Sequence, residues 1–404
     1  MMKNKKYSGY EPYDYLEKKD YEQFEFAEEI GWGDVEPYEV LLSEAGEQRL
    51  EKIIQKNIII SLHDHLIDLP KDKGQMIAAI REGRPATGYE ALSKSCLDAV
   101  IDNLGMYFLI GAEKNGWKWN DCIYDLGMRL CDIDHQDLII RCNGIEDIIK
   151  AKKEGKVAFI ASFEGCMMIE NELDRLDILY GLGVRMLGIT YNDANTLGSG
   201  LAEKKDRGLT NLGYKAIERL NKLGMAIDIS HCGDQTSLDV IEASTKPVFI
   251  SHAGARAVWN SSRMMSDQVL IACAKKGGIL GIEAAPHTTL SDKYPEQGLD
   301  SFFDHLKYAV DLMGIDHVGF GPDTMYGDHC GLHVVFSKGL SMESFLKKGT
   351  TEMPHIPYVR GLENPTEASN NIVRYFVKSG YSDQDIAKAI GGNALRVLKE
   401  VWYK

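Results

Sequence analysis

Short apolar runs alternate with longer amphipathic segments along most of this chain. The runs are bounded by polar or glycine residues, which is typical of strands buried on both faces of a parallel sheet. Segments between them, such as Asn211–Leu223 and Ser266–Lys276, place apolar residues at helical spacing. Strand candidates separated by such crossovers predict a (β/α)8 barrel of the TIM type, with a doubly wound open sheet as the alternative. The candidates are Ile58–Leu62, Ala99–Leu109 (an ambiguous run), Val157–Ser162, Val184–Thr190, Ala226–Ser230, Val248–Ser251, Ile279–Ile282 and Val318–Phe320.

The segments outside this pattern define the expected organisation of the chain. Residues 1–50 are expected to form an N-terminal extension packed on the barrel, and residues 51–404 to form the barrel itself. Residues 326–365 form a long irregular insertion after the last strand. A loop of that length is uncommon unless it has a function, so we expect a lid over the site. Helical spacing returns in the C-terminal segments Thr366–Ser379 and Ser382–Tyr403.

Composition and charge narrow the classes of partner. The 404 residues are 44% hydrophobic and 26% charged, which is ordinary for a globular protein and excludes a disordered chain. The formal net charge is −14 with no polybasic cluster, so we expect neither nucleic acid nor a membrane surface as a partner. No apolar run approaches the roughly 18 to 20 residues that a spanning helix needs. The N-terminal stretch lacks the apolar core of a secretory signal, so a cytoplasmic location is expected.

Cysteine usage agrees with that location. The chain has eight cysteines, none within three residues of another, so it contains no C-x-x-C pair for zinc or redox chemistry. Without an export signal we expect reduced thiols. Cys166 and Cys232 adjoin residues of the site discussed next, and we expect them to pack rather than to react.

Six ionisable residues follow predicted strands, where a barrel places its catalytic groups. His63 and His65 end the first run, and alternation along the strand predicts that both imidazoles face inward while Asp64 faces the other way. Taken singly, a histidine or carboxylate at a strand end is more often structural than functional. Together, four histidines and two carboxylates surround one barrel mouth; they are His63, His65, Glu164, His231, His252 and Asp323.

Burying so many ionisable groups is costly unless something pairs them, and metal ions do so well. Imidazole and carboxylate ligands suit Zn²⁺ first, with Mn²⁺, Fe²⁺ or Co²⁺ as alternatives. Six ligands exceed the needs of one zinc ion. The sequence therefore predicts two divalent ions, with Glu164 as the candidate bridge between them.

From about Ile58 to Trp402 the chain resembles the membrane (renal) dipeptidase family, metallopeptidases of the amidohydrolase superfamily of (β/α)8 barrels. The resemblance lies in short segments that occur in the family's order. They are the paired histidines before Leu69-Pro70, Phe163-Glu164-Gly165, Leu187-Gly188-Ile189-Thr190-Tyr191-Asn192, Asp228-Ile229-Ser230-His231, Ser251-His252 with Arg263, His317-Val318-Gly319-Phe320-Gly321 with Asp323, and Gly391-Gly392-Asn393.

The resemblance implies a binuclear zinc dipeptidase. One metal would be held by the first-strand pair with Asp323, and the other by His231 and His252, with Glu164 bridging. A metal-bridging hydroxide would attack the peptide bond, and Asp323 would act as general base and then as acid. The implied substrates are small dipeptides, L,L and also L,D; Arg263 would contact the C-terminal carboxylate, and Arg256 is its nearest competitor. A homodimer is left open.

Two positions depart from the family pattern. The first strand usually carries His-x-Asp, and this chain has His63-x-His65, which makes the metal pair more electropositive. Tyr191 stands where better-known members have a substrate-contacting histidine. A tyrosine hydroxyl still donates to a developing oxyanion but carries no positive charge.

Other interpretations remain open. His-x-His is common elsewhere among amidohydrolases, so an N-acyl amino acid deacylase or a lactonase is the second interpretation. A catalytically inactive, metal-free binding barrel is the third, and the six filled ligand positions argue against it. His329 and His333 have metal-like spacing but lack the glutamate that metalloprotease helices place beside the first histidine, so we expect them on the surface or in the lid.

Overall fold

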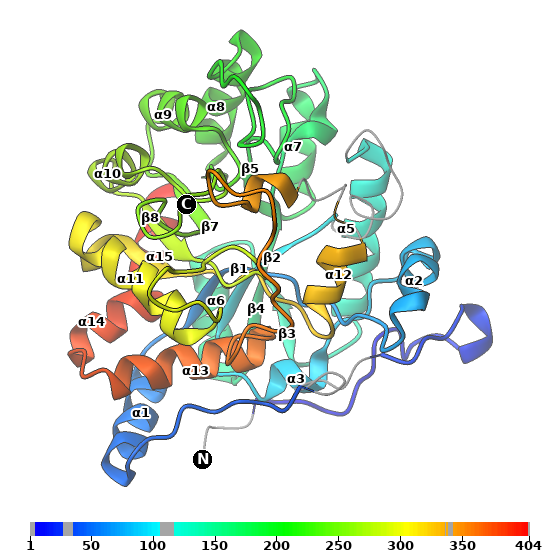
Figure 1. The fold of residues 1–404 in the computed structure, drawn as a ribbon. Helices are drawn as coiled ribbons and strands as arrows, with labels where there is room; N and C mark the ends of the chain where they lie inside the picture. The colour runs from blue at the N-terminus through cyan, green and yellow to red at the C-terminus, as the bar shows by residue number, and fades with distance from the viewer. Residues whose placement is uncertain (1–4, 27–34, 106–116, 336, 338–341, 403–404) are drawn as a thin grey trace.

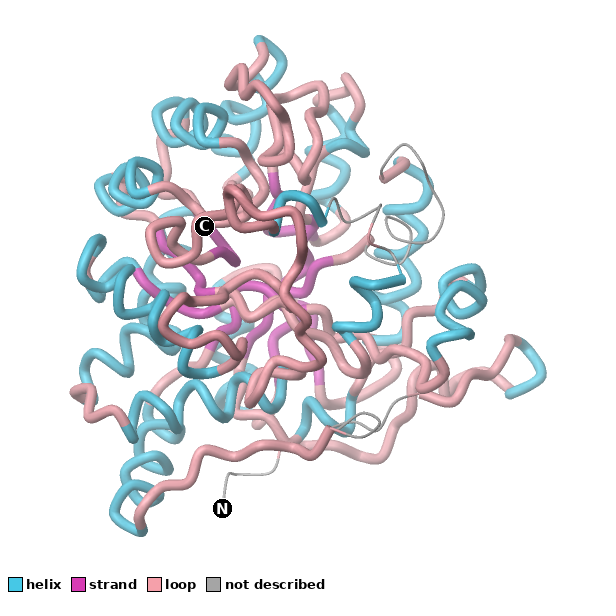
Figure 2. The backbone as a smooth tube through the Cα atoms, in the orientation of Figure 1, coloured by secondary structure: helices cyan, strands magenta, loops and turns pink. Residues whose placement is uncertain are grey.

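Parallel strands form one sheet that curls into a nearly closed barrel. The computed structural model describes residues 5–26, 35–105, 117–335, 337 and 342–402. Eight strands follow one another around the barrel in the order β1-β2-β4-β5-β6-β7-β8-β9, and helices surround them (Figure 2). They are β1 (Ile60–Asp64), β2 (Ala99–Asn103), β4 (Val157–Phe163), β5 (Val184–Gly188), β6 (Ala226–Asp228), β7 (Phe249–Ala253), β8 (Ile279–Ile282) and β9 (Val318–Phe320). The predicted (β/α)8 barrel is confirmed.

Each barrel strand coincides with a predicted apolar run. The ambiguous run Ala99–Leu109 contributes a strand only over its first five residues, and its positions 106–109 lie outside the described residues. One further strand, β3 (Ile139–Arg141), pairs with β4 off the main path and was not predicted. Past the strand ends, the Asp323 amide donates to the His63 carbonyl and the His65 amide to the Thr324 carbonyl. These bonds join the last strand to the first.

The helices begin and end at residues that satisfy their free backbone groups. Helix α8 (Asn211–Leu223) matches its predicted bounds; the Thr210 side chain accepts a hydrogen bond at its start, and Gly224 ends it in the left-handed conformation. None of the helices in the described residues is long and apolar enough to cross a membrane. The other helices are α1 (Glu44–Lys56), α2 (Met76–Glu82), α3 (Tyr89–Ser93), α5 (Trp119–Ile133), α6 (Ile145–Glu154), α7 (Asp174–Gly181), α9 (Asp234–Ala243), α10 (Asp267–Lys275), α11 (Leu299–Met313), α12 (His329–Val335), α13 (Pro365–Lys378), α14 (Asp383–Ala387) and α15 (Asn393–Val401).

The C-terminal segment differs from the single helix predicted over Ser382–Tyr403. It forms α14, a π-helical turn over Lys388–Gly392 and then α15. The interruption lies at Gly391, where an added Cβ would stand 2.1 Å from the carbonyl oxygen of Ile58. Because the backbone approaches the first strand so closely, the helix deviates there. Val397, Leu398 and their neighbours on α15 then pack with the inward apolar residues of the strands.

The N-terminal segment and the segment after β9 both pack on the barrel. Helix α1 spans residue 50, and the Val40 amide donates to Asn371 on α13. On the other side, the Tyr13 amide and the Tyr10 hydroxyl donate to Asp132 on α5. The segment after β9 crosses the barrel mouth in the orientation of Figure 1. It is held there by backbone bonds from Arg263 to Ser344 and from Lys348 to Asn260.

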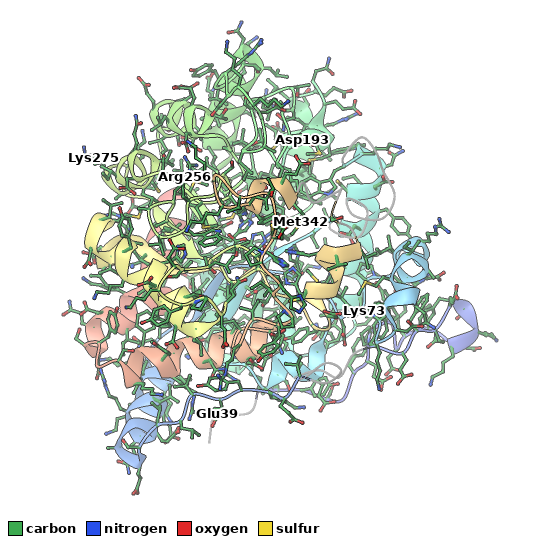
Figure 3. The ribbon with its side chains drawn as sticks, viewed as in Figure 1. Glu39, Lys73, Asp193, Arg256, Lys275 and Met342 are labelled. Atoms are coloured by element: carbon green, nitrogen blue, oxygen red, sulfur yellow. The ribbon has the colours of Figure 1, made fainter. Side chains whose placement is uncertain are left out.

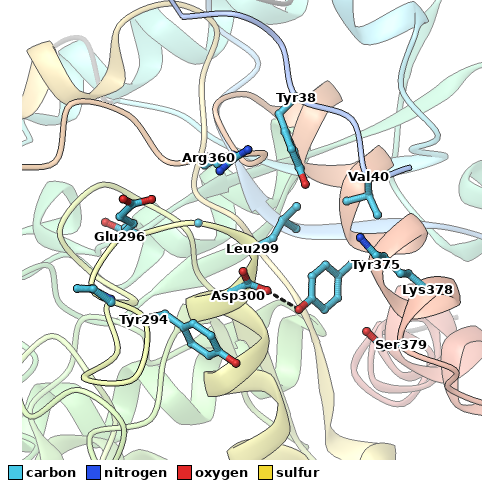
Figure 4. A pocket seen from close by; sticks show the side chains of 13 residues that line it. Tyr38, Val40, Tyr294, Glu296, Leu299, Asp300, Arg360, Tyr375, Lys378 and Ser379 are labelled. Atoms are coloured by element: carbon cyan, nitrogen blue, oxygen red, sulfur yellow. Dashed lines mark hydrogen bonds between the residues drawn. The ribbon is translucent and has the colours of Figure 1, made fainter. Parts of the chain in front are cut away.

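A surface cavity of about 610 Å³ lies where the N-terminal segment, the start of α11 and α13 meet (Figure 4). Tyr38, Tyr294 and Tyr375 contribute to its wall, and the Tyr375 hydroxyl donates to Asp300 over 2.6 Å. None of the six predicted metal ligands lines this cavity. The site at the barrel mouth is a separate feature.

Candidate metal centre

The six predicted ligands come together at the carboxyl-terminal end of the barrel. The Glu164 carboxylate lies centrally: its Oε2 is 3.2 Å from His231 Nε2, 3.6 Å from His252 Nε2 and 4.0 Å from His63 Nε2. Its Oε1 is 3.8 Å from His65 Nε2. Asp323 Oδ1 lies 3.3 Å from His63 Nε2 and 3.1 Å from His65 Nε2. Two ligand sets therefore share Glu164, one with His63 and His65 and one with His231 and His252.

A β-bulge turns His63 into this site. Ile60 and Leu62 pack in the barrel interior, so regular alternation would send His63 outward. The register between β1 and β2 shifts between Ser61 and Asp64, which inserts one residue and changes the phase of the strand. His63 and His65 consequently face inward, while Asp64 accepts hydrogen bonds from Ser61 and from Thr324.

A second bulge lies on β7. Phe249 packs in the barrel interior and Ala253 on the outside, and the register between β7 and β8 shifts between Ile250 and Ala253. His252 lies within this irregular stretch and faces the centre of the site. Bulges next to active sites commonly re-aim a side chain in this way.

Outer hydrogen bonds hold the Nδ1 atom of each histidine, and every Nε2 faces the centre. His65 Nδ1 donates to the Asn103 carbonyl over 3.0 Å, and His231 Nδ1 donates to Asn192 Oδ1 over 2.8 Å. The Ser251 hydroxyl donates to Asp228 over 2.6 Å and accepts from His252 Nδ1 over 2.8 Å.

For His63, Asn103 Nδ2 lies 2.7 Å from Nδ1, and Asn103 Oδ1 is buried without a partner. With the amide turned by 180°, Oδ1 would accept the hydrogen bond from Nδ1–H of His63. All four imidazoles then direct an Nε2 lone pair inward, which is the tautomer a metal requires, and the outer partners fix it.

The charges of these groups are strongly coupled. Burial lowers the pKa of His65, but its close approach to Asp323 and the charge of Glu164 outweigh burial and raise that pKa to about 9. Burial raises the pKa of Asp323, but the nearby imidazoles of His63 and His65 hold it well below its ordinary value. Burial and the charges of His63 and Arg263 keep the pKa of His252 well below its usual range. The carboxylates therefore remain ionised at neutral pH and attract positive charge.

Unsatisfied polar atoms show that this site fits metal ions. His63 Nε2, His65 Nε2, Glu164 Oε1 and Asp323 Oδ1 are buried without a hydrogen-bond partner. In the second set, His231 Nε2 and His252 Nε2 approach to 2.8 Å. Two facing lone pairs and four orphaned ligand atoms are costly to bury without a shared cation. The nitrogen and oxygen donors suit Zn²⁺, Mn²⁺ or Co²⁺.

Backbone geometry supports both carboxylates. An added Cβ on Gly188 would stand 2.1 Å from the carbonyl oxygen of Glu164, so only glycine lets β5 approach the end of β4. Asp323 adopts the left-handed region at φ 57°, which is uncommon outside glycine and tolerated best by aspartate and asparagine. Strained residues of this kind cluster at functional sites.

Tyr191 and Arg263 lie beside the second ligand set. The Tyr191 ring stacks on His231, with 4.3 Å between the ring centroids. Arg263 is 1% exposed, donates to the carbonyls of Ser230 and His252, and forms an ion pair of 2.9 Å with Glu283. Arg263 therefore adjoins the site, but its guanidinium already has a buried acidic partner that the sequence did not reveal.

Two further predictions concern neighbouring residues. Cys166 and Cys232 are buried, and burial raises the pKa of the Cys232 thiol to about 12, so neither position resembles a reactive thiolate. His329 and His333 are buried, so they do not lie on the surface; they lie in the segment after β9, the other place expected for them. They belong to the short helix α12, which packs into the barrel mouth.

Sequence reasoning missed the outer partners Asn103, Asn192, Asp228 and Ser251. Asn192, Asp228 and Ser251 lie within one or three residues of a predicted site residue, so polar neighbours at strand ends were the available signal. Asn103 ends the second strand in the same manner as His63 ends the first. Its pairing with both His63 and His65 depends on the order of strands around the barrel.

Behind these partners, a buried ion pair supports the second strand. Asp102 accepts from the amide of Leu66 over 2.9 Å and pairs with Arg129 of α5, and both side chains are about 1% exposed. We expect Asp102→Ala to lower the free energy of unfolding by about 3–5 kcal/mol, because Arg129 keeps a buried charge without its partner. Urea unfolding followed by tryptophan fluorescence measures the change.

The exposed Asp193, labelled in Figure 3, provides the matched control. Asp193→Ala is expected to change the free energy of unfolding by no more than about 0.5 kcal/mol. Equal effects of the two substitutions would contradict a supporting role for the Asp102–Arg129 pair.

Four histidines and two carboxylates at the mouth of a parallel barrel form a candidate metal centre. Residues 123–348 match the family model described as membrane dipeptidase (Peptidase family M19). Because this match covers more than half of the chain, the protein belongs to the membrane dipeptidase family. It is a metal-dependent hydrolase of the dipeptidase type.

The chain is also similar to individual proteins. The chain is 28% identical over 269 residues to "Uncharacterized protein in pqqA 5'region" of Klebsiella pneumoniae, a match covering 65% of this chain and 88% of that protein. It is 27% identical over 280 residues to dipeptidase tcpJ of Claviceps purpurea, covering 69% of this chain and 58% of that protein. The crystal structure of the probable dipeptidase PvdM from Pseudomonas aeruginosa shares the fold, with a TM-score of 0.69 and 20% sequence identity. The match covers 89% of this chain and 99% of that chain.

Proposed function

We propose that this protein is a binuclear zinc dipeptidase that hydrolyses small L,L and L,D dipeptides. One observation carries the proposal: four imidazoles, each held through Nδ1, direct Nε2 toward a shared Glu164, and Asp323 joins the first pair. In this proposal His63, His65 and Asp323 hold one ion. His231 and His252 hold the other, and Glu164 bridges the two.

The bound ions would supply the Lewis acidity that polarises a peptide carbonyl and makes a water molecule nucleophilic near neutral pH. The protein's own groups supply the rest of the reaction. Asp323 is ionised and only partly enclosed, with 15% of its side chain exposed, so it is placed to take a proton from water and return it to the leaving amine. Tyr191 has a hydroxyl that is able to donate to the developing oxyanion from beside His231.

A dipeptidase must measure the length of its substrate, and a fixed cation near the reacting carbonyl does so by pairing with the free C-terminal carboxylate. Arg263 is the proposed cation, since its guanidinium contacts the backbone of Ser230 and His252. Planar guanidinium groups suit carboxylates. A substrate carboxylate would then share Arg263 with Glu283.

The second interpretation keeps the metals and changes the substrate to an N-acyl amino acid or a lactone. Glu164 at the bridging position favours the dipeptidase. A screen of the purified, zinc-loaded protein against L,L and L,D dipeptides, N-acyl amino acids and lactones separates the two. We expect turnover of dipeptides to exceed the others, whereas a preference for N-acyl amino acids or lactones would contradict the proposal.

The role of Arg263 has its own prediction. Removing Arg263 alone would strand the buried Glu283, so the comparison uses Glu283→Gln as the reference and adds Arg263→Met to it. We expect the added substitution to lower kcat/KM for a free dipeptide by ~10 to 10³-fold, because a desolvated charge-assisted pair is lost.

Amidation of the dipeptide's C-terminus is the second change in a double-mutant cycle between protein and substrate. It should lower kcat/KM of the Glu283→Gln protein by a similar factor and have little further effect once Arg263 is replaced. If the effects of amidation and of Arg263→Met on kcat/KM simply multiply, Arg263 does not contact the carboxylate.

A further inference from the structure

A second group of histidines lies beside the metal centre and takes no part in the proposed metal binding. His287, His329 and His333, here called the histidine pocket, are each at least nine-tenths buried. The rings of His329 and His333 meet edge to face at 4.7 Å, and those of His333 and His287 stack at 6.0 Å.

The fold holds these rings in place from two directions. His329 and His333 are one helical turn apart on α12, and Leu332 on another side of that helix packs into an apolar cluster with Ile67 and Met325. Figure 3 shows α12 between the labelled Lys73 and Met342, in front of the barrel mouth. His287 comes from the loop after β8, where its backbone has φ 71° and its amide donates to Gln297 over 2.7 Å.

The ring nitrogens of the pocket have spare hydrogen-bonding capacity. Nδ1 of His287 and Nδ1 of His333 are buried without a partner. The ring of His329 lies edge to face against that of His333. Burial lowers the pKa of His287 and of His329 to about 4, and burial together with the neighbouring histidines holds the pKa of His333 well below its ordinary value. The three imidazoles are therefore neutral at neutral pH, and each keeps one nitrogen lone pair.

The pocket lies at the first-strand end of the metal centre. Leu332 of α12 packs with Ile67, two residues after His65, and with Met325, two residues after Asp323. Arg263 lies at the opposite end, against the backbone of His252. A substrate that spans the two ligand sets would thus meet a guanidinium at one end and neutral imidazoles at the other.

We propose that the histidine pocket binds the free α-ammonium group of the substrate. Neutral imidazoles offer acceptor nitrogens, and an ammonium group offers only N–H donors. Neutral rings accept these bonds without the repulsion that a cationic residue would cause. This inference rests on the proposed dipeptidase function and extends it, because it makes the amino terminus the second point at which substrate length is measured.

The pocket is not a third metal site in this arrangement. Within the described residues, three groups have ligand atoms close enough together to hold an ion, and none includes His287, His329 or His333. The groups are His63, His65 and Glu164; His63, Asp228 and His252; and Glu164, His231 and His252. Binding of an acidic side chain through the ring N–H groups is an alternative outcome of the test.

The test compares a dipeptide, alanylglycine, with propanoylglycine, which lacks only the amino group. We expect the zinc-loaded wild type to favour alanylglycine in kcat/KM, and His329→Phe to reduce that preference by at least ~10-fold, as for one lost hydrogen bond to a charged group. His329→Gln, which keeps an acceptor oxygen, should retain part of the preference. His355→Phe is the control, since this exposed histidine lies near His287 but outside the pocket.

Calorimetry of both ligands gives the same comparison for binding, independently of turnover. A preference for the amine that is unchanged in His329→Phe and in His329→Gln would overturn the inference while leaving the dipeptidase proposal intact. A loss confined to substrates with an acidic first side chain would overturn it in favour of carboxylate binding. A wild type that binds alanylglycine no better than propanoylglycine would overturn it as well, whereas lack of dipeptide hydrolysis alone would contradict only the dipeptidase function.

Discussion

Removal of divalent metal is expected to abolish dipeptide hydrolysis, and Zn²⁺ is expected to restore it. Six ligand groups lie around Glu164, and four of their donor atoms are buried without any other partner. Without a metal ion, the imidazoles and carboxylates of the site interact only by sharing protons with one another. The measurement is initial rate after dialysis against a chelator and again after addition of Zn²⁺, Mn²⁺ or Co²⁺, each of which suits ligands without thiolates.

The chelated protein must be shown to remain folded. Circular dichroism before and after dialysis separates loss of the reaction from loss of the barrel. Full activity in a folded protein stripped of metal would contradict the proposed chemistry.

Asp323→Asn is expected to lower kcat by at least ~10²-fold, the lower range for general acid–base catalysis. The amide retains the shape of the side chain and one coordinating oxygen, but it accepts no proton at neutral pH. The same backbone position should tolerate the change, because asparagine adopts the left-handed conformation seen at φ 57° as readily as aspartate.

Metal content measured on the same samples is the control for this variant. We expect most of the metal to be retained, so that the loss of turnover reports the missing proton carrier. If turnover survives with unchanged metal content, the base is another group.

Much of the barrel follows from local pattern. Each barrel strand coincides with an apolar run because strands covered on both faces need continuous apolar sequence. The ligands were also predictable, because polar residues directly after such runs gather at one end of a parallel barrel. β3 escaped prediction because its three residues lie at the margin of the barrel, where Arg141 is exposed.

Other features depend on contacts that no local pattern encodes. The bulge that turns His63 inward arises from the register between β1 and β2, although the predicted inward direction of His63 and His65 agrees with the structure. The buried partner of Arg263 is Glu283, which directly follows β8 and lies twenty positions further along the chain. His329 and His333 were expected on the surface or in the lid, and their burial in α12 was not predictable because helical spacing does not show which face the rest of the fold will cover.

Elemental analysis of protein with measured dipeptidase activity tests the central claim most directly. The account predicts about two divalent ions per chain, with activity rising in proportion to metal content up to that ratio. Fully active protein that contains no stoichiometric metal would contradict it.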